Sequence, residues 1–254
     1  MNVVVLVKSV SDPSGQPRLG PDFLMDRSAE GTLDPTDEFG VEAALQLTAA
    51  GGGTVTALSM GPDGAGAAVR RAFAMGVDAG VLVTDPLLRG ADTLATARVL
   101  AAAIGQAGFD LVLAGVESTD GYTGTLAVAV AEFLDVPSAT FARKVSVADG
   151  VARIERQTES GYDVIECPLP AVITVTAGST EPRYPTLKGI MASKSKTLES
   201  RTLADLGLDA AAVAATQHVS HVTPAPAKSG GVVIEAGDDA AVRIADALDQ
   251  AKVI

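Results

Sequence analysis

The chain has 254 residues, a hydrophobic fraction of 47% and a formal net charge of −12 at pH 7. This length suffices for one substantial core, with or without a tail. The acidic balance disfavours general nucleic-acid binding, which needs positive charge to displace counterions. No apolar run reaches the length of a membrane span and the N-terminus has no signal-peptide layout, so we expect a cytoplasmic protein that is not membrane-embedded.

The thiol and imidazole content points away from a metal centre. The single cysteine, Cys167, excludes an intramolecular disulfide and a thiolate cluster. It lies in a strand-like stretch, so we expect a buried structural thiol. His218 and His221 stand in a polar region without supporting carboxylates, which makes a poor metal site.

Apolar runs and helical patterns alternate four times over the first 135 residues. The apolar run at 3–7 is typical of a strand buried on both faces. Asp34 or Thr36 offers a side-chain cap for the first helix. The expected elements are strand 3–7, helix 38–50, strand 54–59, helix 63–75, strand 80–84, helix 92–107, strand 110–114 and helix 124–134. This alternation predicts a doubly wound, mostly parallel α/β sheet with helices on both faces.

The pattern changes after residue 137. Alternating stretches at 141–148 and 151–157 flank Asp149-Gly150, a strong signal for a hairpin turn. Residues 162–166 read as a third antiparallel strand, and 171–176 as a return to the core sheet. We therefore predict an antiparallel hairpin extension of the parallel sheet.

The C-terminal part is rich in alanine, threonine, serine and proline. One short helix is expected around 202–206 and a longer one at about 237–251. We predict an α/β domain over 1–200 and a C-terminal linker and helix over 201–254. A helix behind a proline-containing linker often packs on a partner subunit; the alternative is that it caps its own sheet.

The 181–196 segment has no helical or strand periodicity. Two prolines, Pro182 and Pro185, favour extended geometry around them. Such a loop displays four apolar side chains and two lysines: Tyr184, Leu187, Ile190, Met191, Lys194 and Lys196. Apolar side chains beside positive charge suggest a surface that docks on another protein. The alternative is that the loop folds back and buries them in its own domain.

Three loops leave the carboxyl ends of predicted strands, where open parallel sheets bind ligands. The first loop follows Val7, the second covers residues 59–62 and the third covers residues 115–126. In the last loop, the N–H groups of 122–125 with nearby threonine hydroxyls suit a phosphate at a helix N-terminus. The alternative is a turn with polar caps. No Walker lysine and no Gly-x-Gly-x-x-Gly after the first strand occur, which disfavours a nucleotide triphosphate motor and an ordinary NAD dehydrogenase.

The run Glu181-Pro-Arg-Tyr-Pro-Thr-Leu187, with Ile190-Met191 and trailing lysines, resembles the signature of the β subunit of electron-transfer flavoprotein. The resemblance extends from residue 1 to about 210. It implies that the segment is a recognition loop for partner dehydrogenases, with Leu187 as its anchor. It further implies that the apolar neighbours shape the loop and the lysines meet acidic partner surfaces. The family's run of consecutive lysines is broken here by Ser193 and Ser195.

The resemblance also implies one bound AMP that serves structure more than chemistry. The family's contacts map onto Leu6, Asp34, Pro35, Thr36, Asp37, Met60, Gly115, Asp120, Gly121, Tyr122, Thr123, Gly124, Thr125 and Leu126. The family often has Asn-Pro where Asp34-Pro35 stands, and Gln-Ala-Ile-Asp where residues 117–120 read Glu-Ser-Thr-Asp. Some relatives bind a second FAD in place of AMP and split electron pairs, an alternative that these loops do not discriminate. In the family, an acidic residue of the β chain helps to position the α-subunit domain that carries FAD. Gln157 stands at that position here, with Glu155 and Glu159 nearby.

The function implied is that of a β subunit in a heterodimer whose α subunit holds most of the FAD contacts. The pair takes electrons from flavin dehydrogenases such as the acyl-CoA dehydrogenases of fatty acid β-oxidation and passes them to a membrane quinone oxidoreductase. The sequence has no Ser-His-Asp set, no cysteine in a basic setting and no clustered carboxylate pair, so we expect that the chain alone catalyses no reaction. The resemblance implies an electron carrier. One rival is an ATP-using adenine-nucleotide hydrolase or ligase, which needs a Ser-Gly-Gly-x-Asp-Ser-type loop that residues 8–12 do not supply. A second rival, a stress-type nucleotide-binding module, would not need the 181–196 segment.

Overall fold

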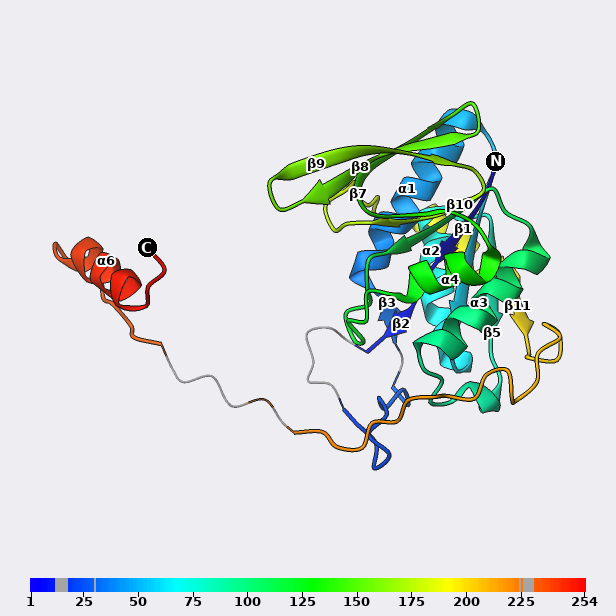
Figure 1. Ribbon diagram of the computed structural model, residues 1–254, viewed down its shortest axis with the longest axis horizontal. Coiled ribbons are helices and arrows are strands. Elements are labelled where there is room, and N and C mark those ends of the chain that lie inside the picture. Colours follow the sequence, from blue (N-terminus) through cyan, green and yellow to red (C-terminus); the bar gives the residue numbers. More distant parts are fainter. Residues whose placement is uncertain (12–17, 30, 224, 226–230) are drawn as a thin grey trace. The chain divides into compact units, whose positions relative to one another are not determined.

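The computed structural model describes residues 1–11, 18–29, 31–223, 225 and 231–254. The chain forms two compact units, residues 1–220 and residues 221–254. The first unit contains the central sheet and its covering helices, and the second contains the C-terminal helix (Figure 1).

A nine-stranded sheet runs through the first unit in the order β11-β5-β4-β1-β6-β10-β7-β8-β9. Its strands are β1 (Asn2–Leu6), β4 (Thr54–Met60), β5 (Ala79–Val83), β6 (Leu111–Gly115), β7 (Ser138–Ala148), β8 (Val151–Thr158), β9 (Gly161–Pro168), β10 (Ala171–Val175) and β11 (Leu198–Arg201). Pairings from β11 through to β7 are parallel, and β7-β8-β9 are antiparallel. A separate pair joins β2 (Ser9–Val10) to β3 (Thr32–Leu33). The predicted doubly wound sheet with an antiparallel extension is therefore confirmed.

Helices cover both faces of this sheet. They are α1 (Pro35–Gly51), α2 (Gly66–Met75), α3 (Thr93–Ala107) and α4 (Leu126–Leu134). Helix α5 (Leu187–Ser195) packs on α2. Two short 3-10 turns are η1 (Asp63–Ala65) and η2 (Pro86–Leu88). Alternate residues of β1 enter two different cores. Val3 and Val5 pack in the core with α1 and α2, whereas Val4 and Leu6 pack in the core with α3 and α4. This double burial explains why the strand is continuously apolar.

The predicted hairpin turn has the expected geometry. Asp149 and Gly150 have φ values of 51° and 75°. Left-handed backbone at both central residues belongs to a type I′ turn, whose twist matches that of the flanking strands.

Two elements differ from the sequence-based expectation. Leu187–Ser195 forms helix α5 instead of an extended loop, and Thr186 caps it by accepting a hydrogen bond from the Gly189 N–H at 3.0 Å. The short helix expected at 202–206 is wrong, because residues 203–207 form only hydrogen-bonded turns. Gly207, with φ of 70°, ends that turn before a second helical turn can form.

The first unit continues beyond residue 200. Strand β11 pairs with β5, and Leu203, Leu206 and Val213 are buried in the core with α3 and α4. The linker expected after this stretch includes residues 224 and 226–230, which lie outside the described part of the chain.

The second unit contains helix α6 (Ala240–Gln250), somewhat shorter than predicted. Its apolar side chains Val242, Ile244 and Leu248 are exposed. Among the helices in the described ranges, none has both the length and the apolar character needed to cross a bilayer.

Candidate functional site

The first candidate site lies where the sheet reverses its winding direction. Strand β1 is flanked by β4 on one side and β6 on the other, so the chain proceeds in opposite directions from β1. Open α/β sheets bind ligands in the crevice outside the carboxyl ends of such strands. Of the predicted residues there, Leu6 ends β1 and is buried, and Met60 ends β4 and is partly exposed.

Asp34 ties the start of helix α1 to the loop that follows β6. The carboxylate is fully buried. One of its oxygens accepts hydrogen bonds from the N–H and hydroxyl of Thr36 at 2.9 and 2.8 Å. The other accepts from the N–H and hydroxyl of Thr119 at 2.7 and 3.0 Å. Of the two predicted caps, Asp34 and Thr36, Asp34 is therefore the cap of α1, with Pro35 at the first helical position.

A second buried carboxylate, Asp37, lies one turn further along α1. It accepts a hydrogen bond from the Lys8 N–H at 2.7 Å. Burial and the neighbouring Asp34 raise the pKa of Asp37 well above its usual range. A Cβ on Gly115 would lie 3.0 Å from an Asp37 oxygen. The end of β6 can approach α1 this closely only because residue 115 is a glycine.

Two cations converge on Asp120. Lys8 Nζ lies 2.5 Å from one carboxylate oxygen and Arg27 Nη2 lies 2.8 Å from the other. Lys8 Nζ also donates to Ser118 Oγ at 3.0 Å. Burial alone would raise the pKa of Asp120, but hydrogen bonds and positive charge from Lys8 and Arg27 lower it. Lys8 and Arg27 therefore form an ion-paired cluster with Asp120 at the carboxyl edge of an otherwise acidic chain.

Sequence reasoning missed both of these cations. Lys8 lies just after the first predicted strand, and that position was the one available signal. Arg27 belongs to no motif, and it reaches the Ser9 carbonyl at 2.9 Å as well as Asp120. A contact between residues 93 positions apart leaves no local pattern.

The loop before helix α4 has an open, irregular backbone. Tyr122 and Gly124 have φ values of 49° and 63°. A Cβ on Gly121 would lie 2.9 Å from Ser118 Oγ. In the described part of the chain, no side chain caps the first turn of α4. The predicted residues at this helix start are the exposed Thr123 and Thr125 and the half-buried Leu126. This edge thus combines free helix N–H groups with the two cations, a combination suited to an anion.

The second candidate site is the docking segment, residues 181–196. Tyr184, Leu187 and Met191 are 89%, 78% and 62% exposed, and Ile190 is 41% exposed. Leu187 and Met191 are four residues apart on α5 and therefore share a face. These side chains are not buried in their own unit, so the alternative of a loop folded onto its own domain does not hold.

Helix α5 rests on α2 through its backbone and its C-terminal end. Arg70 donates to the Ser193 carbonyl at 2.9 Å. A Cβ on Gly189 would clash with the Ala74 carbonyl oxygen. Lys196 donates to the Val77 carbonyl and lies over the Phe73 ring, 5.3 Å from its centroid. Of the two lysines expected to face a partner, only Lys194 has an exposed side chain free of these contacts.

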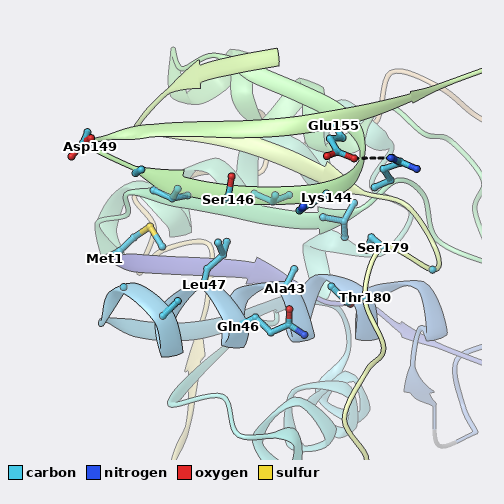
Figure 2. A pocket seen from close by; sticks show the side chains of 18 residues that line it. Met1, Ala43, Gln46, Leu47, Lys144, Ser146, Asp149, Glu155, Ser179 and Thr180 are labelled. Atoms are coloured by element: carbon cyan, nitrogen blue, oxygen red, sulfur yellow. Dashed lines mark hydrogen bonds and ion pairs between the residues drawn. The ribbon is translucent and has the colours of Figure 1, made fainter. Parts of the chain in front are cut away.

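A groove of about 950 Å³ lies between helix α1 and the β7-β8 hairpin (Figure 2). Arg143 pairs with Glu155 across its rim at 2.8 Å and stacks on Tyr162, 3.9 Å from the ring centroid. Glu155 is therefore already paired within the chain. Gln157, two residues further along β8, is exposed. Ser179 and Thr180 line the groove just before the docking segment.

Cys167 has the structural role that its sequence context predicts. Its side chain lies in the core with α1 and α2. Burial raises the pKa of the thiol, which keeps it protonated and unreactive at neutral pH.

Comparison with known proteins identifies the class to which this chain belongs. The family model for the electron transfer flavoprotein domain matches residues 22–206. The chain belongs to the electron transfer flavoprotein family. It is similar to the electron transfer flavoprotein subunit beta of Mycobacterium tuberculosis, with 42% identity over 91% of each chain. The subunits beta of Bacillus subtilis and Megasphaera elsdenii are 37% and 34% identical over 82% and 97% of this chain, and over 82% and 96% of their own lengths. Its role is accordingly that of a β subunit in an electron transfer flavoprotein.

Proposed function

We propose that this chain is the scaffold and docking subunit of an electron carrier, with one adenine nucleotide bound at the switch point. A separate α subunit holds the FAD that carries electrons, so the redox chemistry is that of the flavin. The chain catalyses no reaction of its own. It forms a heterodimer with the α subunit, which the second unit, residues 221–254, binds; the earlier part of the predicted C-terminal region, from residue 201, belongs to the first unit.

The nucleotide proposal rests on the chemistry of the carboxyl edge. Lys8 and Arg27 supply positive charge, and the first turn of α4 supplies N–H groups for a phosphate. We propose that AMP is bound through the predicted residues at the ends of β1, β4 and β6 and at the start of α1. The buried links from Asp34 and Asp37 hold these loops together. The nucleotide then stabilises the subunit without entering the reaction.

The docking proposal is carried by one observation: a helix fixed to the unit displays a row of exposed apolar side chains. Such a row is typical of protein interaction surfaces. We propose that Leu187 is the anchor and that Tyr184, Ile190 and Met191 surround it. Lys194 adds steering toward acidic partners. Lys196, also expected to take part, instead holds the end of α5 through its contacts with Val77 and Phe73. The partners are flavin dehydrogenases, including acyl-CoA dehydrogenases, and electrons leave to a quinone oxidoreductase.

The rival for the nucleotide site is a second FAD in place of AMP, as in electron-bifurcating systems. Co-expression with the α subunit, followed by acid release and identification of the bound nucleotides, separates the two. One FAD and one AMP per heterodimer is the expected result. Two FAD per heterodimer would replace the AMP proposal, and a colourless monomer that hydrolyses ATP would contradict the carrier role.

The docking surface is tested by Leu187→Ala in the purified heterodimer. We expect the KM for the heterodimer in acyl-CoA dehydrogenase turnover to rise about tenfold. An anchor side chain that becomes buried in the complex contributes about 1.4 kcal/mol or more to binding. Leu87→Ala is the matched control, since Leu87 is also exposed but lies outside the docking segment. An equal response of the two variants would remove Leu187 from the anchor role.

A further inference from the structure

The irregular stretch before helix α5 is tied to helix α1 by one side chain. Arg183 Nε lies 2.7 Å from one oxygen of Glu42, and Nη2 lies 3.0 Å from the other. The Arg183 N–H also donates to Glu42 at 3.2 Å. The backbone and the guanidinium are therefore both held, which fixes the direction in which the chain enters α5.

Glu42 is a buried, fully hydrogen-bonded partner for this arginine. Its side chain is 5% exposed, and Gln46, one turn along α1, donates to it at 2.8 Å. With the three bonds from Arg183, the carboxylate accepts four hydrogen bonds. Burial alone would raise the pKa of Glu42, but the bonds from Arg183 and Gln46 lower it. The Glu42 carboxylate is therefore ionised throughout the neutral range, and all its hydrogen-bonding capacity is used.

The Arg183–Glu42 pair matters for docking because Arg183 lies next to the exposed apolar side chains of the segment. Arg183 is adjacent to Tyr184 and four residues before Leu187, the two most exposed apolar side chains of the segment. The contacts of Arg70 and Lys196 with α2 fix the opposite, C-terminal end of α5. The Arg183–Glu42 pair thus controls the half of the segment that carries the anchor leucine.

We propose that Glu42 and Arg183 are positioning residues for partner docking, holding Leu187 in its binding orientation before the partner arrives. This inference rests on the docking function proposed above. Glu42 is too buried to touch a partner, so it acts only through the segment. Pre-ordering the segment removes the entropy cost of fixing it at the moment of binding. Loss of the pair therefore weakens docking without changing electron transfer inside the docked complex.

The direct test is Glu42→Gln in the heterodimer, measured by acyl-CoA dehydrogenase turnover. The variant has nearly the same shape but places an amide N–H₂ against the guanidinium. We expect the KM for the heterodimer to rise about tenfold, equivalent to about 1.4 kcal/mol, with kcat and bound nucleotides unchanged. Glu38→Gln is the matched control, because Glu38 also lies on α1 and pairs with Arg71 at 3.1 Å but does not reach the segment. An equal KM for the two variants would overturn the proposal.

The double variant Glu42→Gln/Leu187→Ala separates positioning from a general structural role. If Glu42 acts by placing Leu187, its removal adds little once the leucine is gone, so the double variant has nearly the KM of Leu187→Ala alone. Effects that multiply would overturn the proposal. If Leu187→Ala alone leaves the KM unchanged, the proposed docking function is wrong. If Leu187→Ala raises the KM but Glu42→Gln does not, the docking function stands and only the positioning role is overturned.

Arg183→Lys provides a second variant if Glu42→Gln does not fold. Lysine keeps the charge but loses the bidentate geometry. We expect a KM about threefold higher, between wild type and Glu42→Gln, with an unchanged unfolding temperature. A folded Arg183→Lys heterodimer with wild-type KM would also overturn the proposal.

Discussion

Helix α1 serves two sites, and the two handle polar groups differently. At its N-terminus, Asp34 and Asp37 bind backbone and hydroxyl groups of the loops at the proposed nucleotide site. Further along the same helix, Glu42 binds a segment whose apolar side chains remain exposed. A nucleotide site needs its polar groups gathered inward and linked. A docking site needs exposed apolar side chains held in a fixed orientation, and here the half-buried ion pair of Arg183 with Glu42 holds them.

The largest expected effect breaks the first of these regions. Asp34→Ala removes an acceptor of four hydrogen bonds and leaves the Thr36 and Thr119 N–H groups without it. Unsatisfied buried donors cost about 1–3 kcal/mol each, so we expect a loss of about 3 kcal/mol in unfolding free energy. Denaturant titration of the heterodimer measures it, with loss of bound nucleotide as the parallel readout.

Asp34→Asn is the matched control for this change. It retains one acceptor oxygen and its size, and the resembling family often carries asparagine at this position. The asparagine N–H₂ must face the N–H of either Thr36 or Thr119 and leaves that donor unsatisfied, so we expect an intermediate loss of about 1–2 kcal/mol. Equal losses for Asp34→Ala and Asp34→Asn would show that charge, rather than the hydrogen-bonded link, holds the two loops together.

The two acidic positions of the nucleotide region should respond oppositely to pH. The pKa of Asp120 is lowered from 3.8 by Lys8 and Arg27 in opposition to burial. Its stabilising contribution is therefore present above pH 3.8 and is lost as the pH falls. We expect Asp120→Asn to cost about 1–2 kcal/mol at pH 7, with a difference from wild type that shrinks as the medium becomes acidic.

Asp37→Asn sharpens this comparison because its pKa shift has the other sign. Burial and Asp34 raise the pKa of Asp37, so its contribution is fully present below pH 3.8 and declines as the pH rises. Wild type should therefore lose stability relative to Asp37→Asn on going from pH 4 to pH 8. Parallel pH trends for the two variants, measured by chemical denaturation, would contradict this electrostatic assignment.

Gly189→Ala tests the second region by its packing. The added methyl group clashes with the Ala74 carbonyl oxygen, so α5 must move away from α2. We expect about 1–2 kcal/mol of destabilisation and weaker docking, with nucleotide content unchanged. Gly105→Ala in α3 is the control: a Cβ there meets nothing within 4 Å, and alanine should stabilise by about 0.5–1 kcal/mol. Destabilisation by both would indicate a general helix effect.

The two regions also differ in how far sequence patterns could predict them. Apolar periodicity gave the core strands and helices, because Val3 to Leu6 alternate between two buried faces. Asp34 was predictable as a cap since capping is a local rule. Helix α5 was not predictable in this way, because contacts with Arg70 and Ala74, more than 100 residues earlier, hold a segment with little pattern of its own.

The cations of the nucleotide region escaped prediction for the same reason. Lys8 and Asp120 are 112 positions apart, and the fold brings them together only at the switch point. The resemblance to a family supplied positions for ligand contacts but no partner for Asp120. Long-range ion pairs are a property of topology, which a one-dimensional pattern does not contain.

The smallest expected effect distinguishes the two lysines of the docking segment. Lys194 is exposed, so Lys194→Ala should remove only steering: a two- to threefold slower association with an acidic partner, vanishing at high salt. Lys196 instead contacts Val77 and Phe73, so Lys196→Ala should lower the unfolding free energy by about 1 kcal/mol. Stopped-flow association rates at two ionic strengths and a denaturant titration, applied to both variants, provide the comparison. A salt-dependent rate loss confined to Lys196→Ala would reverse the assignment, because it would mean that the Lys196 ammonium leaves its internal contacts to meet the partner.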